Sequence, residues 1–185
     1  MFNFYNISRF EPDYNFSDKV WNDISDVIKC KNDDILSYYL WLEKQHVKFI
    51  NMFINYFSVD RLGYAIFLED LKKISSDYFF DMEEPIERIN NLSRYNLKIL
   101  NTNDLNFLLK SWVRGLCYLH FFDTLTGSFI RKTDDFNFLL MLHKNYNIDE
   151  IFKPTKGVFV SVDMDIISYD AVLMPKNYGE FLLKI

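Results

Sequence analysis

The sequence predicts an α+β protein, a mostly helical single domain of about six helices with a small antiparallel β-sheet at its C-terminal end. Apolar residues recur at helical spacing over most of residues 17–146. After Pro154, short runs of β-branched and aromatic residues alternate with turn formers, which is typical of strands. The 185 residues include 19 Phe, 12 Tyr and 3 Trp, and each buried aromatic side chain removes roughly 150–250 Å² from water. This composition favours one well-packed core.

The first part of the chain contains an N-terminal strap and two predicted helices. Residues 1–16 are irregular and aromatic, and we expect them to pack on the body as a strand or strap. Ser17 is the expected N-cap of a first amphipathic helix. A second helix, opened by Asp33 or Asp34, is predicted to reach Phe57. Apolar residues cover most of its circumference, which indicates a central helix.

Three further helices are predicted in the middle of the chain. Asp60 is the expected cap of a third helix that runs to about Phe80. Pro85 stands in the first turn of a fourth helix, a position that proline tolerates well. A fifth helix is expected to begin at a cap formed by Asn103 or Asp104.

The fifth helix carries an apolar stripe over residues 105–119 that includes Trp112, whose side chain we expect in the core. It is predicted to stop near Gly127, because glycine adopts the left-handed conformation at helix ends. Thr133 is the expected cap of a sixth, short helix over residues 136–143.

Three short segments form the predicted C-terminal sheet: Gly157–Val162, Ile166–Leu173 and Glu180–Ile185. The expected organisation is a single domain, 1–185, made of the strap (1–16), the helical body (17–146) and the small sheet (157–185).

Charge is distributed unevenly along the chain. The formal net charge is −5, with 10 basic and 16 acidic residues in 1–90 against 11 basic and 10 acidic residues in 91–185. An acidic surface repels phosphate backbones and attracts basic proteins. The expected partner is therefore a basic protein, and nucleic acid is not expected.

The same sequence favours a cytoplasmic protein without a membrane partner. Its longest apolar stretches, such as 35–42 and 116–122, are far shorter than the about 20 residues that cross a bilayer. Its first residues lack the continuous apolar segment of a secretory signal. Cys30 and Cys117 stand in apolar helical patterns, and we expect both to be buried thiols in a reducing compartment.

The sequence predicts no catalytic residues, no metal site and no cofactor. Its histidines, His46, His120 and His143, are too scattered for a zinc site. One alternative is a metal-dependent enzyme, because Asp163 and Asp165 resemble the carboxylate pair with which nucleotidyltransferases hold a divalent metal. The Gly-Ser element that precedes this pair in those enzymes is missing.

A second enzymatic alternative depends on haem. The segment Tyr118–Gly127 (YLHFFDTLTG) is similar to the distal-helix segment of haem oxygenases. The resemblance implies a helix over these residues, with His46 as the proximal ligand.

The strongest polar feature is the stretch 77–87, in which five acids and no base are interleaved with aromatic residues. Carboxylates steer a basic partner, and aromatic anchors supply contact area. The residues that we predict to bind a partner are Asp77, Phe79, Phe80, Asp81, Glu83, Glu84 and Glu87. The alternative is a solvated connection whose acids favour the N-terminus of the following helix.

These features favour a non-catalytic binding protein, of the immunity or antitoxin type, that neutralises a basic toxin enzyme by binding to it. In size, acidity and aromatic content the chain is similar to the immunity proteins of bacterial toxin systems, which implies binding to a nuclease-like toxin domain. A third alternative is a viral or phage protein that blocks a host factor. A composition poor in Ala and Gly and rich in Asn, Ile, Lys and Phe indicates an AT-rich coding sequence, as on mobile elements or viruses, which is in keeping with the toxin-inhibitor interpretation.

Overall fold

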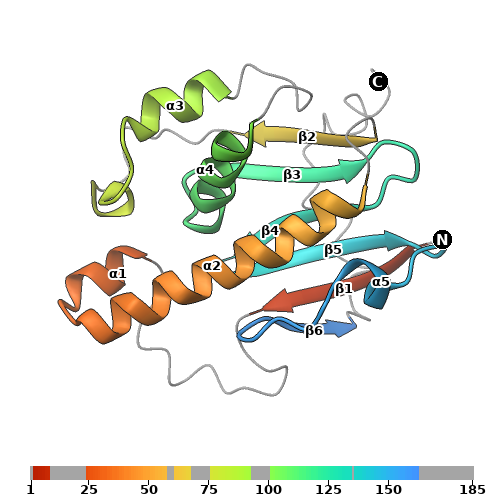
Figure 1. The fold of residues 1–185 in the computed structure, drawn as a ribbon, viewed down its shortest axis with the longest axis horizontal. Coiled ribbons are helices and arrows are strands. Elements are labelled where there is room, and N and C mark those ends of the chain that lie inside the picture. The colour runs from red at the N-terminus through yellow and green to blue at the C-terminus, as the bar shows by residue number, and fades with distance from the viewer. Residues whose placement is uncertain are drawn as a thin grey trace.

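The computed structural model describes residues 2–8, 24–57, 61–67, 76–92, 101–134 and 136–162. Their centre is a six-stranded antiparallel sheet with the strand order β2-β3-β4-β5-β1-β6 (Figure 1). The strands are β1 (Phe2–Ser8), β2 (Leu62–Phe67), β3 (Tyr118–Asp123), β4 (Phe129–Asp134), β5 (Asn137–His143) and β6 (Phe159–Val162).

The predicted fold class was wrong about the sheet, which is neither small nor confined to the C-terminal end. The predicted strap contains β1, and the predicted third and sixth helices contain β2 and β5. The second half of the predicted fifth helix is β3. Within the predicted C-terminal sheet only β6 is described, because Ile166–Leu173 and Glu180–Ile185 lie outside the described residues.

The described residues also form five α-helices and one 3₁₀ turn. These are α1 (Ile24–Lys29), α2 (Asp33–Tyr56), the 3₁₀ turn η3 (Ser76–Phe79), α3 (Pro85–Leu92), α4 (Thr102–Val113) and α5 (Ile148–Ile151). The long helix α2 agrees with its prediction within a residue or two. Its N-cap is Asn32, whose side-chain oxygen accepts hydrogen bonds from the N–H groups of Asp34 and Ile35.

Helix α4 ends earlier than predicted, and Gly115 is the reason. Gly115 has φ +79°, the left-handed conformation that glycine adopts without strain. Its N–H donates to the Trp112 carbonyl at 3.0 Å, and the Leu116 N–H donates to the Ser111 carbonyl at 2.9 Å. This pair of bonds is the Schellman motif, which satisfies the last carbonyls of a helix. The apolar stripe over 105–119 is therefore a helix followed by a strand.

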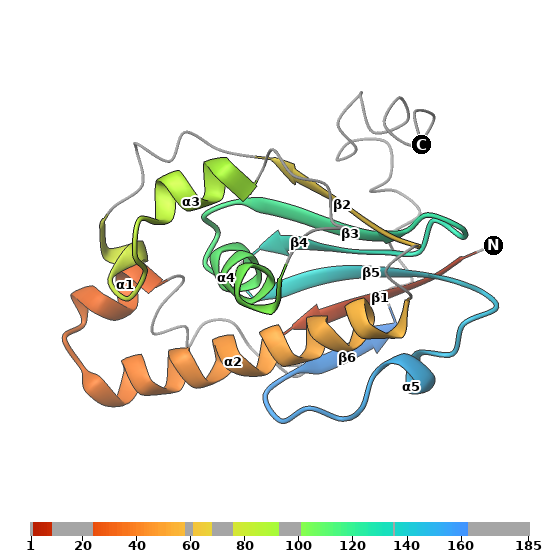
Figure 2. The ribbon, with the colours of Figure 1, turned by 45° about the horizontal axis from the view of Figure 1, so that its top comes forward.

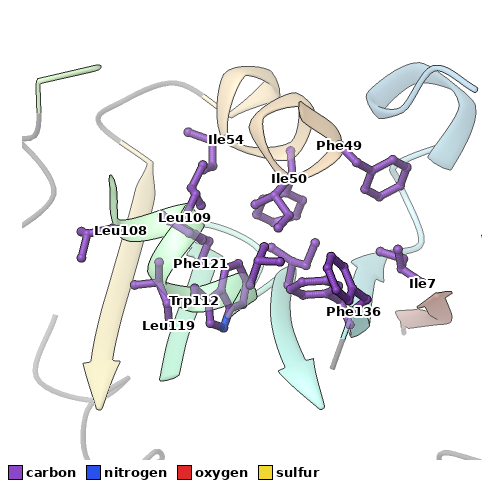
Figure 3. Packing of buried hydrophobic residues seen from close by; sticks show 14 of the residues in the cluster. Ile7, Phe49, Ile50, Ile54, Leu108, Leu109, Trp112, Leu119, Phe121 and Phe136 are labelled. Carbon is purple, nitrogen blue, oxygen red and sulfur yellow. The ribbon is translucent and has the colours of Figure 1, made fainter. Parts of the chain in front are cut away.

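Helices α2 and α4 lie over the same face of the sheet (Figures 1 and 2). Figure 3 shows Ile50 and Ile54 of α2 close to Leu109 and Trp112 of α4 above the strands. Trp112 is fully buried, as predicted, and its ring makes edge contacts with Phe121 and Phe138 of the sheet. A second, smaller cluster of Phe122, Phe129 and Leu139 lies on the other face of the strands.

The two cysteines differ in exposure. Cys117 is buried, as predicted, whereas Cys30 is exposed at the C-terminal end of α1, so the prediction of burial was wrong for Cys30. Both are free thiols.

Candidate functional site

The predicted binding residues lie in η3, the connection after it and the start of α3. We call residues 77–87 the acidic segment. Contacts between α1 and η3 support one end of this segment. At the other end, the Arg88 guanidinium of α3 pairs with the Asp104 carboxylate of α4 at 2.7 Å. A backbone hydrogen bond from Met82 to the Phe79 carbonyl, 2.8 Å long, closes a turn between these two supports.

A buried arginine holds the middle of the acidic segment. Arg114 is the C-cap of α4, and its side chain is 0% exposed. Its Nε donates to Glu43 Oε2 at 2.6 Å, and its Nη1 donates to Asp81 Oδ1 at 2.6 Å and to the Tyr78 carbonyl at 3.1 Å. Its Nη2 lies 3.3 Å from a second oxygen of each carboxylate. We call this arrangement of Arg114, Glu43, Asp81 and the Tyr78 carbonyl the Arg114 clamp.

Lys110, one helical turn before Arg114, balances the charge of the clamp. Its Nζ lies 2.5 Å from Asp81 Oδ2 and 4.0 Å from Glu43 Oε1, so two cations face two carboxylates. Burial raises the pKa of the Glu43 carboxyl above its ordinary value, although Arg114 opposes the shift. Burial acts in the same direction on Asp81, but hydrogen bonds from Arg114 and Lys110 outweigh it and hold the pKa of Asp81 below its ordinary value. Both oxygens of Asp81 are thus occupied within the protein.

The groups of the acidic segment that face solvent lie on both sides of Asp81. Phe80 is 46% exposed, and its ring centre lies 5.1 Å from the Arg114 guanidinium carbon. Phe79 is partly buried and packs against the core. Three exposed glutamates line a hollow of about 370 Å³, whose lining is Glu83, Glu84, Glu87, Arg88, Asn91, Leu92 and Asp104. The lining of the hollow thus contains four carboxylates and one guanidinium, which is paired with Asp104.

The structure therefore divides the predicted binding residues into three groups. Phe80 and Asp81 belong to or contact the Arg114 clamp, and the three glutamates line the hollow. Phe79 lies against the core. Asp77 lies in η3, and its side chain is outside the described atoms.

Sequence reasoning missed the residues of α2 and α4 that hold the segment. Glu43 lies in a helix that is apolar nearly all round, and such a carboxylate requires a buried cation. That signal was present, but it does not identify Arg114 or Lys110 as the partner. Only the fold brings these residues together.

The described residues do not support either enzymatic alternative. The haem resemblance implied a helix over 118–127, where the structure has β3 and a hairpin turn. The His46 side chain is buried against the rings of Phe136 and Phe138, with its Nδ1 2.9 Å from the Leu42 carbonyl oxygen. Asp163 and Asp165 lie outside the described residues. Within the described ranges, no group of three or more His, Cys, Asp or Glu is placed to hold a metal ion.

No protein-family model matches the chain, and no curated protein or solved structure shows significant similarity to it. The described helices include none that combines the length and the apolar character needed to cross a membrane.

Proposed function

We propose that this chain is a non-catalytic binding protein whose acidic segment docks a basic protein. The observation that carries the proposal is Phe80, a large aromatic side chain that is 46% exposed and whose ring centre lies 5.1 Å from the guanidinium carbon of the buried Arg114. Aromatic residues held rigidly at the centre of a surface are the usual anchors of protein interfaces. Glu83, Glu84 and Glu87 follow within seven residues, so the anchor is flanked by negative charge.

The chemistry of this surface defines the partner that we propose. A complementary surface carries an apolar pocket for the Phe80 ring and several Lys or Arg side chains around it. The net charge of −5 adds a general attraction for a basic protein and a repulsion for nucleic acid. We propose that the partner is a basic enzyme such as a toxin domain, with such a surface near its active site. We therefore propose inhibition of such an enzyme in the cytoplasm as the biological role.

Photo-crosslinking tests where the partner binds. A photoreactive phenylalanine such as p-benzoylphenylalanine is placed at position 80 and, as a matched control, at Tyr38 of α2, which is 52% exposed. After irradiation in cells of the source organism, we expect one basic protein to be linked through position 80 and not through position 38. Equal products at both positions, or none at position 80, would contradict the proposal.

Binding kinetics with that purified protein test the role of charge. We expect Glu83→Gln, Glu84→Gln and Glu87→Gln together to lower the on-rate several-fold at low salt. The wild-type on-rate should fall as the Debye length shrinks from about 30 Å at 0.01 M to about 8 Å at 0.15 M salt. The variant should show a flatter dependence. Identical on-rates would remove the glutamates from the interface.

A further inference from the structure

The Arg114 clamp joins three segments of the chain that are far apart in sequence. Glu43 belongs to α2, Arg114 ends α4, and Tyr78 and Asp81 belong to η3 and the connection after it. We propose that Arg114 is a positioning residue that presets the conformation of residues 78–82 before a partner arrives. This inference rests on the proposed function in one respect only, namely that these residues form a binding surface.

The hydrogen-bond geometry supports a fixed conformation for this stretch. A guanidinium has five N–H donors in a rigid planar fork, and Arg114 makes five hydrogen bonds. Two of the bonds go to the Asp81 carboxylate and one to the Tyr78 carbonyl. Phe80 lies between these two residues in sequence, so its backbone is held on both sides.

The other half of the clamp is anchored in the core. Arg114 follows directly on the buried end of α4, and Glu43 follows the buried Leu42 in α2. Sites supported by helices whose side chains are fixed by packing hold their geometry better than sites on loops alone. The clamp thus transfers the rigidity of the helical layer to an otherwise exposed connection.

This arrangement assigns different roles to the acids of the segment. Asp81 acts through the clamp, because its oxygens are bonded to Arg114 and Lys110. The Phe80 ring and the three glutamates of the hollow remain available for direct contact. A preset surface loses less conformational entropy on binding, which increases affinity without any added contact.

Hydrogen exchange of the free, full-length protein tests the proposal. In Asp81→Asn we expect the amides of residues 78–82, with Met82 as the clearest reporter, to exchange at least about tenfold faster, as expected for lost charge-assisted hydrogen bonds. Amides in α2 and β3 should change little. The matched control is Asp149→Asn, which also replaces a carboxylate by an amide but lies in the first turn of α5, outside both the clamp and the acidic segment. It should leave residues 78–82 unchanged.

Arg114→Lys supplies an independent variant, because lysine keeps the charge but cannot form the planar fork. We expect the same local acceleration, and Asp81→Asn carries the test if this buried substitution prevents folding. Unchanged exchange at residues 78–82 in Asp81→Asn would overturn the proposal. An equal acceleration across α2, β3 and the segment would also overturn it, since that would be a global loss of stability. No partner is present, so this result is independent of the crosslinking that tests the proposed function.

Discussion

At the Arg114 clamp the fully buried side chain is the cation, whereas at the hairpin between β3 and β4 it is the carboxylate. Arg114 is 0% exposed and its partner Asp81 is 32% exposed. In the hairpin, Asp123 is 0% exposed and its partner Arg61 is 35% exposed. Two ion pairs of the same chemistry are therefore built with opposite partners facing the solvent.

The Asp123 carboxylate is surrounded by donors from three parts of the chain. Arg61 donates through Nε at 3.0 Å and Nη2 at 2.7 Å, and the Tyr146 hydroxyl lies 3.4 Å away. Within the hairpin turn, the Thr126 hydroxyl and the N–H groups of Leu125 and Thr126 also donate to Asp123. This set of contacts, which we call the Asp123 anchor, fixes the hairpin to the start of β2.

The comparison shows that the cost of breaking an ion pair depends on which group is left behind. Removing Arg114 leaves Glu43, which is almost fully buried, without its hydrogen-bonded cation and with only Lys110, whose Nζ lies 4.0 Å away. Neutralising Asp123 leaves Arg61, which water can reach. An unpaired charge that is buried lowers the unfolding free energy far more than an unpaired charge that is exposed to water.

The largest effect is expected for Arg114→Met. The variant should lose about 3–5 kcal/mol of unfolding free energy, as measured by urea denaturation, because the buried Glu43 loses both hydrogen bonds from Arg114 and keeps only the more distant Lys110 as a cation. The matched control is Arg88→Met, which removes an arginine that is 38% exposed and should cost about 1 kcal/mol or less. A loss below about 1 kcal/mol for Arg114→Met would show that the clamp is not stabilising.

An intermediate effect is expected for Asp123→Asn. We expect a loss of about 1–3 kcal/mol, because hydrogen bonds to a charged acceptor are weakened while Arg61 remains hydrated. Asp149→Asn, at an exposed acid in the first turn of α5, is the control and should change the stability little. An effect as large as that of Arg114→Met would contradict the comparison.

The same variant should alter the dependence of stability on pH. Burial alone would raise the pKa of Asp123, but hydrogen bonds from Arg61 and Thr126 outweigh it and hold the pKa below the ordinary 3.8. The ionised Asp123 therefore makes its full contribution to the unfolding free energy above pH 3.8. This contribution is lost as the pH falls through the lower pKa of the folded state. Asp81, whose pKa is also lowered, likewise stabilises the fold less as the pH falls. Glu43, whose pKa is raised, has the opposite effect, because its protonation favours the folded state. When the unfolding free energy is measured by urea denaturation at a series of pH values below about 4, it should therefore fall less steeply with decreasing pH in Asp123→Asn than in the wild type.

The smallest effect is expected for the combined replacement of Glu83, Glu84 and Glu87 by Gln. These side chains are exposed, and the unfolding free energy should change by no more than about 0.5 kcal/mol. A loss above about 1 kcal/mol would instead favour the alternative in which these acids stabilise the N-terminus of α3. The measurement thus separates a binding role from a structural one.

The long helix α2 was predictable because its capping and its apolar pattern agree over 24 residues. Strand β5 was mistaken for a helix because its residues Phe138–Leu142 pack on both faces of the sheet. Such a continuous apolar run has no strand-like alternation, so its periodicity cannot separate a strand from a helix. Only its pairing with the neighbouring strands β4 and β1 makes this segment a strand.

Three glycines show what local sequence could and could not reveal. Gly115 was a visible stop signal for α4, placed directly after Arg114. The left-handed conformation predicted for Gly127 is confirmed, with φ +75°, but it occurs in a hairpin and not at a helix end. The need for glycine at position 63 of β2 could not be read from the local sequence, because it depends on the neighbouring strand β3: a Cβ there would lie 2.4 Å from the Phe122 ring. The clamp likewise depends on contacts between distant segments, so the sequence indicated the acidic segment but not what holds it.

Strand β1 has a consequence for how this protein is made. It precedes every other described element in the chain, yet Phe2 pairs with His143 of β5 and Tyr5 pairs with Val162 of β6. At roughly 5–20 residues per second, on the order of 10 s passes between the synthesis of β1 and that of its neighbours. Throughout that interval the nascent chain carries an unpaired strand whose free N–H and C=O groups can join other chains. The six described strands can close into one sheet only after Val162 has been translated.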